Sequence, residues 1–179
     1  MARPRPAGFV PTGCTAPGKA LVTALLLATL LALLPTPSRA QALAPQAGLE
    51  DLATRYAAAW SGQDPARLAA FYAEDGLLVV NQGEPAVGRA AIAAKARGFM
   101  QAFPDMTVRL RRVEQRDGVV EFHWRWTGTN TGPGGTGRAV DLVGYEEWTL
   151  DGDGLIVQSL GHYDAAEYER QVNGPQPGS

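Results

Sequence analysis

The fold is decided by the stretch Val120-Glu-Phe-His-Trp-Arg-Trp-Thr127, in which apolar and polar side chains alternate strictly. A period of two is typical of a β-strand that buries one face and exposes the other. The residues that should share the buried face are Val120, Phe122, Trp124 and Trp126. The sequence therefore predicts a sheet with one apolar face, against which other elements must pack.

Neighbouring segments extend this strand into a meander. Met106, Val108 and Leu110 alternate with polar residues before it, and Asp117-Gly118 is a hairpin-turn dipeptide. Further strands are expected at residues 139–150 and 155–163, after a glycine-rich connection (128–137) and a tight turn (151–154).

Helical periodicity dominates the part of the chain before this sheet. We expect a helix from Leu49 to Gly62, a second from Asp64 to Gly76 that carries Phe71 and Tyr72, and a third over 89–103. A short strand is expected at 77–81, and a capping box at 164–167 predicts a final helix ending near residue 172. Helices grouped ahead of an antiparallel sheet indicate an α+β fold, in which N-terminal helices pack on a strongly curved, mostly antiparallel sheet that encloses a cone.

The charge is distributed unevenly along the 179 residues. Residues 1–40 contain four basic residues and no acid, and the remaining 139 residues carry 12 basic against 18 acidic residues. This negative balance argues against nucleic acid as a partner. The only cysteine is Cys14, so residues 41–179 can form no disulfide, thiolate zinc site or cysteine nucleophile.

The first forty residues have the pattern of a secretory signal peptide. The apolar run Ala20–Leu34 would form a helix of about 22 Å, shorter than the roughly 30 Å hydrocarbon core of a bilayer. Prolines and small residues follow, and cleavage fits equally well after Ala40 or Ala42. We expect a secreted or periplasmic protein without stable membrane insertion, with a leader at 41–47 and a flexible tail at 173–179. The alternative is an uncleaved membrane anchor.

Short motifs follow one another in a fixed order along residues 48–172. They are Tyr56-Ala-Ala-Ala-Trp60, Phe71-Tyr-Ala-Glu-Asp75, Gly88-Arg-Ala-Ala-Ile92, Phe103-Pro-Asp105, Thr127-Gly-Thr-Asn-Thr-Gly132, Thr136-Gly137, Asp153-Gly-Leu-Ile156 and His162-Tyr-Asp164. Their order and spacing resemble the nuclear transport factor 2-like superfamily, in particular its SnoaL-like branch. The resemblance implies a cone-shaped pocket for a small, lipophilic organic molecule and a homodimer formed through the open face of the sheet.

That superfamily includes ketosteroid isomerases, polyketide cyclases, limonene epoxide hydrolases, dehydratases and non-catalytic binders, and fold alone does not choose among them. The epoxide hydrolase Arg-x-Asp pair is missing from residues 127–130, and the position of that family's second aspartate falls on Gly161. Asn130 stands where SnoaL-like cyclases place a histidine. On the following strand this chain offers Asp141 and Glu146 as acids.

Glu146 is the strongest catalytic candidate. It shares strand parity with Leu142 and Trp148, so a regular strand directs it into the apolar interior. Burial would raise its pKa and suit it to proton transfer near neutral pH, as the tuned carboxyl groups of ketosteroid isomerase illustrate. The alternative is a bulge that shifts the register by one residue and turns Glu147 inward instead.

Tyr56 and Asn81 are the candidates for polarising a substrate carbonyl. Tyr56 lies one helical turn from Trp60, and its phenol could donate a hydrogen bond to a developing oxyanion. Asn81 ends the short strand, near the place of a water-binding asparagine in the epoxide hydrolases. Core packing of Tyr56 and ordinary turn chemistry at Asn81 are the alternatives.

Further residues are expected to line the pocket. They are Trp60, Phe99, Phe103, Trp124, Trp126, Asn130 and Trp148. Packing in the core is the commoner role of such aromatic side chains. The same side chains can pack in the core and line a pocket when the core contains a cavity. The two histidines, His123 and His162, show no spacing that brings metal ligands together, so neither a metal nor another cofactor is expected.

These observations lead to three hypotheses for an exported α+β protein. The first is a cofactor-free isomerase, cyclase or dehydratase that uses Glu146 as its acid or base. The second is a non-catalytic binder or carrier of a small lipophilic ligand. The third is a dimerisation module, which requires an interior filled by side chains.

Overall fold

The computed structural model describes residues 46–174. The signal peptide expected at 1–40, both cleavage positions, most of the leader and residues 175–179 lie outside the described residues. Within residues 46–174, no helix has the length and apolar character needed to cross a lipid bilayer.

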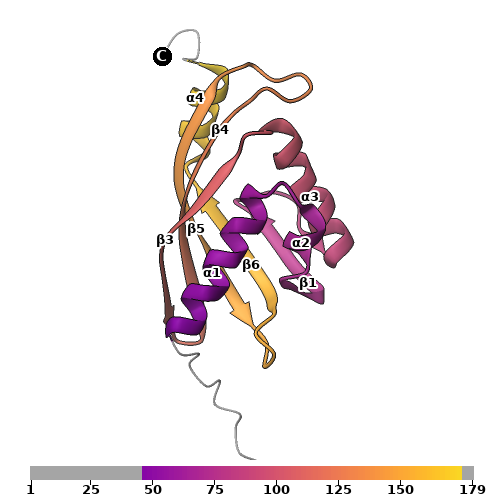
Figure 1. The fold of residues 1–179 in the computed structure, drawn as a ribbon, viewed down its shortest axis with the longest axis vertical. Coiled ribbons are helices and arrows are strands. Elements are labelled where there is room, and N and C mark those ends of the chain that lie inside the picture. The colour runs from indigo at the N-terminus through magenta and orange to yellow at the C-terminus, as the bar shows by residue number, and fades with distance from the viewer. Residues whose placement is uncertain (1–45, 175–179) are drawn as a thin grey trace, which may run out of the picture. The chain divides into compact units, whose positions relative to one another are not determined.

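Six strands form one curved, unclosed sheet, which confirms the α+β class (Figure 1). The strands are β1 (Tyr72–Val80), β2 (Ala86–Val87), β3 (Thr107–Arg116), β4 (Val119–Thr129), β5 (Ala139–Leu150) and β6 (Ile156–Tyr163). Their order in the sheet is β2-β1-β6-β5-β4-β3. All neighbours pair antiparallel except β1 and β6, so the sheet is mostly antiparallel, as expected.

Four helices accompany the sheet: α1 (Gln46–Ser61), α2 (Pro65–Ala69), α3 (Arg89–Ala102) and α4 (Ala165–Asn173). In Figure 1, α1 runs across the strands and α3 lies beside β1. The predicted caps are present, because Asp64 accepts from the backbone N–H of Arg67 and Asp164 from that of Glu167. Helix α1 begins at Gln46, three residues before the predicted start, so the helix takes up the end of the expected leader.

The prediction that the second helix continues to Gly76 is wrong. Helix α2 ends at Ala69, and Tyr72 already belongs to β1. The backbone carbonyl of Phe71 accepts from the N–H of Ile156, and Tyr72 pairs with Ile156 in β6. Pairing with a strand distant in sequence therefore overrides the local helical pattern, and it turns the fully buried Tyr72 inward.

The apolar face predicted for β4 is the inner face of the sheet. Val120 and Phe122 are fully buried, and Trp124 and Trp126 are 8% and 5% exposed. Phe122 stacks on Trp148 of the neighbouring strand with 4.8 Å between ring centroids. Burial of such side chains contributes about 1.5–3 kcal/mol each, so this face supplies much of the stability of the domain.

Candidate functional site

Glu146 lies on the inner face of β5. It pairs with Phe122 of β4 and Gly161 of β6, without a register shift at this position, and it is 7% exposed. Glu147 points to the opposite face, where its carboxylate is 3.5 Å from the Nε2 atom of His162. The predicted inward orientation of Glu146 is therefore correct, and the alternative that placed Glu147 inside is wrong.

Three donors hold one oxygen of the Glu146 carboxyl group. Its Oε2 accepts from the Tyr56 hydroxyl at 2.9 Å, the Trp148 indole N–H at 2.9 Å and the Ser159 hydroxyl at 2.7 Å. The Tyr72 hydroxyl lies 2.8 Å from that of Tyr56 and extends the network. No hydrogen bond between described residues reaches Oε1, so that oxygen is left for other partners.

Burial dominates the acidity of this group. Loss of hydration raises the pKa of Glu146 above its ordinary value, although the hydrogen bonds from Trp148, Ser159 and Tyr56 act in the opposite direction. Burial also raises the pKa of Tyr56 well above its ordinary value, and the charge of Glu146 adds to that increase. Tyr56 therefore keeps its proton near neutral pH, and Glu146 is the group in this network whose proton can be exchanged.

A cleft of about 70 Å³ lies in front of Glu146. Its aromatic lining consists of Trp60, Phe99, Trp124, Trp126 and Tyr163, and Glu146 is the only charged residue among the described residues that line it. Gly161 borders this space, and a Cβ atom there would lie in ordinary contact with the Cγ atom of Glu146 at 3.7 Å, so a side chain larger than alanine would enter the cleft. A dimerisation module with a filled interior is the hypothesis that this cleft does not favour.

A family model, the SnoaL-like domain, matches residues 53–159, which is more than half of the chain. The chain belongs to the SnoaL-like family. The resemblance inferred from the sequence motifs is therefore confirmed. A search of curated proteins found no match for this SnoaL-like protein.

Solved structures share the fold of this SnoaL-like protein. One is a protein with a ketosteroid isomerase-like fold from Catenulispora acidiphila in complex with trimethylamine, with 20% identity, a TM-score of 0.62, and coverage of 71% of this chain and 98% of that one. A phenazine biosynthesis-related protein from Pseudomonas aeruginosa has 19% identity, a TM-score of 0.58, and coverage of 75% and 93%. At these identities the likeness shows the fold alone.

The structure divides the pocket residues predicted from sequence into two groups. Trp60, Phe99, Trp124 and Trp126 line the cleft of the SnoaL-like protein. The other three, Phe103, Asn130 and Trp148, are not among the lining residues.

None of those three residues borders the cleft, but each has a structural contact near it. Phe103 packs edge-on against Trp126 with 4.9 Å between ring centroids, and Trp148 donates to Glu146. The Asn130 side chain donates to the Ala102 carbonyl and accepts from the Thr136 N–H, so it fixes the connection between β4 and β5.

The two predicted polarising residues are engaged inside the protein. Tyr56 is fully buried and is joined to Glu146, but it does not line the cleft. Asn81 follows β1 with a φ of 50°, and its side-chain oxygen accepts from the backbone N–H of Tyr163 at 3.0 Å. The structure thus brings Tyr56 to Glu146 and uses Asn81 to hold the backbone of a lining residue.

Sequence reasoning missed Tyr72, Ser159 and Tyr163. Ser159 pairs with Trp148 and is fully buried, and the signal available in the sequence was its strand parity, which it shares with Gly161 and Tyr163. Tyr163 lines the cleft at the end of the same strand. The helix predicted over 64–76 includes Tyr72, so its strand parity is not visible in the sequence.

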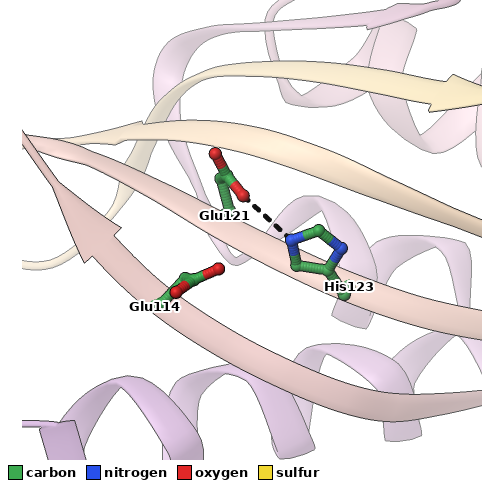
Figure 2. A group of neighbouring side chains, drawn as sticks. All are labelled: Glu114, Glu121 and His123. Carbon is green, nitrogen blue, oxygen red and sulfur yellow. Dashed lines mark hydrogen bonds and ion pairs between the residues drawn. The ribbon is translucent and has the colours of Figure 1, made fainter.

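A second group of polar side chains, Glu114, Glu121 and His123, lies on β3 and β4 (Figure 2). Their ligand-type atoms lie within 4.8 Å of one another, and His123 Nε2 is 2.9 Å from Glu121 Oε2. Arg112 contacts both His123 and Glu114, and Arg116 pairs with Glu114 at 2.8 Å. Arginine side chains therefore provide the positive charge that faces these two carboxylates. The group lies on the face of the sheet opposite the cleft.

Proposed function

We propose that this SnoaL-like protein binds a small, mostly apolar organic molecule in the cleft and that Glu146 transfers a proton on it. The reaction class is isomerisation, cyclisation or dehydration beside a carbonyl group, carried out by the side chains of the protein. One observation supports this most directly: an ionisable carboxyl group, with one oxygen held by three donors, forms the wall of an otherwise apolar cleft.

The chemistry follows from the two unequal oxygens of Glu146. Tyr56, Trp148 and Ser159 fix Oε2, so Oε1 is the atom that meets the ligand. The carboxylate removes a proton from the carbon next to the carbonyl, and the electron pair of that C–H bond moves toward the carbonyl oxygen to give an enolate. The protonated Glu146 then returns the proton to another carbon of the conjugated system, which completes an isomerisation.

A direct test uses cyclohex-3-en-1-one, whose conversion to the conjugated cyclohex-2-en-1-one is followed by ultraviolet absorbance. We expect the wild-type protein to accelerate this conversion and Glu146→Gln to abolish the acceleration. Glu147→Gln is the matched control, because it changes the neighbouring acid on the opposite face of the same strand. Circular dichroism establishes that both variants fold. Equal rates for wild type and Glu146→Gln would refute the role of Glu146.

The second candidate function is binding without chemistry, as a carrier of a small ligand. The aromatic walls and the single carboxyl group suit a small organic ammonium ion, which rings attract through cation–π interactions. The Catenulispora acidiphila protein was solved in complex with trimethylamine, which supports this ligand class. Calorimetric titration with trimethylammonium chloride tests it: micromolar to millimolar binding that Glu146→Gln weakens, without turnover of the ketone, would favour this candidate.

The proposal includes export and self-association. The basic, then apolar, then small-residue pattern of residues 1–40 supports export. The family resemblance supports a homodimer through the open face of the sheet, and Val143 on β5, which is 53% exposed on the face opposite the cleft, is the residue there whose substitution tests it. Size-exclusion chromatography with light scattering, applied to wild type and Val143→Lys, tests the dimer. A wild-type mass equal to one chain would refute it.

A further inference from the structure

Enolate formation requires a hydrogen-bond donor at the ligand oxygen, because negative charge develops there. Neither residue predicted for this role is available. The Tyr56 hydroxyl donates to Glu146, and Asn81, whose side-chain oxygen accepts from the backbone N–H of Tyr163, does not line the cleft. The donor must therefore come from another residue that borders the cleft.

Two tryptophans of β4 are the buried donors without a partner at the cleft. Trp124 and Trp126 both line it, and they are 8% and 5% exposed. Their Nε1 atoms are buried and have no hydrogen-bond partner among the described residues. An indole N–H is a donor only, and a buried donor left unpaired is costly and uncommon in folded proteins. A ligand acceptor would remove that cost.

The sheet register places Trp124 diagonally across from the acid and Trp126 one position further along the same face. Trp124 pairs with Gly144 and Trp126 with Leu142, on the strand that carries Glu146 two residues beyond Gly144 on the same face. A Cβ atom at Gly144 would lie 2.5 Å from the Trp124 ring. Glycine at this position therefore lets the indole lie against the strand that carries Glu146.

We propose that the ligand is a neutral carbonyl compound whose oxygen accepts a hydrogen bond from the indole N–H of Trp124, Trp126 or both. Both Nε1 atoms are covered in the unliganded protein, so a ligand in the cleft would reach them only after the indole ring turns to present its N–H. The two tryptophans would then stabilise the oxygen while Glu146 moves the proton. This inference rests on the function proposed above and names its substrate class.

The test compares cyclohexanone with methylenecyclohexane, which has nearly the same shape and lacks the oxygen. Proton–nitrogen correlation spectra of full-length protein labelled with ¹⁵N report the four indole N–H groups, and Trp→Phe variants assign them. We expect cyclohexanone to shift the Trp124 or Trp126 indole proton downfield and methylenecyclohexane to leave it in place. We also expect the ketone to bind more tightly than the alkene.

Trp124→Phe and Trp126→Phe then measure the contribution of each N–H. Removing a responsible N–H should reduce the preference for ketone over alkene by about 2- to 12-fold, the range for a neutral hydrogen bond. Because both probes meet the same altered cavity, the ratio cancels the effect of the smaller ring. An unchanged ratio in both variants, or equal indole shifts with both probes, would overturn the inference.

Failure of this inference is distinguishable from failure of the proposed function. If Glu146→Gln abolishes turnover while the ketone preference is insensitive to both indoles, the acid role stands and the donor assignment falls. If neither probe binds the folded wild-type protein, the carbonyl ligand class falls together with the proposed reaction.

Discussion

The hydroxyl of Tyr56 joins two buried groups, and its removal should destabilise the domain by an amount that depends on pH. In Tyr56→Phe the ring contacts remain, but the hydrogen bonds to Glu146 at 2.9 Å and Tyr72 at 2.8 Å are lost. Tyr56 donates to Glu146, so the bond between the two hydroxyls is donated by Tyr72. The substitution therefore leaves a carboxyl oxygen with one donor fewer and a buried tyrosine hydroxyl without its acceptor.

The magnitude follows from the charge of Glu146. A hydrogen bond between neutral groups contributes about 0.5–1.5 kcal/mol and one to an ionised group about 1.5–3 kcal/mol. We therefore expect Tyr56→Phe to lower the free energy of unfolding by about 1–3 kcal/mol when Glu146 is protonated and by about 2–4.5 kcal/mol when it is ionised. The loss should increase as the pH rises through the raised pKa of Glu146.

Urea denaturation of wild type and Tyr56→Phe from pH 4 to pH 9 measures this difference. Tyr145→Phe is the control, because it removes a tyrosine hydroxyl from the outer face of β5, beside His162. A loss below about 0.5 kcal/mol, or the same loss at both ends of the pH range, would show that Tyr56 does not support an ionisable Glu146. A similar loss in Tyr145→Phe would assign the effect to tyrosine hydroxyls in general.

Three further changes address the acid, the cleft and the supporting loop. Burial raises the pKa of Glu146 from its ordinary value of 4.5, so the stability this group contributes is present below that value and is lost as the pH rises through the folded-state pKa. The free energy of unfolding of Glu146→Gln, measured in urea, should therefore increase relative to that of the wild type as the pH rises. Gly161→Ala adds a Cβ atom at ordinary contact distances of 3.5–3.9 Å and should fold normally. Gly161→Leu should fill the cleft and abolish ketone isomerisation. Full activity in a folded Gly161→Leu variant would contradict the location of the site. Asn130→Ala loses the hydrogen bonds to Ala102 and Thr136, so it should lower the free energy of unfolding by about 1–3 kcal/mol and leave KM unchanged. A raised KM at unchanged stability would instead show that Asn130 contacts the ligand.

Strand parity made the central part of the site predictable from sequence. Alternation along β4 and β5 depends only on the geometry of an extended chain, so it correctly turned Trp124, Trp126 and Glu146 inward. The β5 ladder carries no shift around Glu146, which is why this local reasoning was sufficient. Trp60 followed from helical periodicity in the same way, whereas Phe99 was expected at the pocket only as one of a set of aromatic side chains.

The partners of those residues could not be predicted, because they depend on contacts between segments distant in sequence. The bond between Tyr56 and Glu146 spans 90 residues, and the bond between Asn81 and Tyr163 spans 82. Tyr72 was missed for a related reason. The apolar residues around it fit a helix as well as a strand, and only its pairing with β6 decides between them. Phe103 and Trp148 were predicted to line the pocket, because sequence shows which side chains are inside but not which of them border a space.

The arrangement around Glu146 argues for use of its proton. A leucine at this position would avoid the cost of burying a carboxyl group, and among the described residues no ion pair between Glu146 and a basic side chain offsets that cost, although the charge of His162 acts to lower the pKa of Glu146. The protein instead commits Tyr56, Trp148 and Ser159 to one oxygen and keeps glycine at 161, where a larger side chain would occupy the space in front of the acid. A carboxyl group that only joined these donors could have both oxygens enclosed by them. In this site one oxygen is enclosed and the group forms the wall of a cleft, which is the geometry that proton transfer to a bound molecule requires.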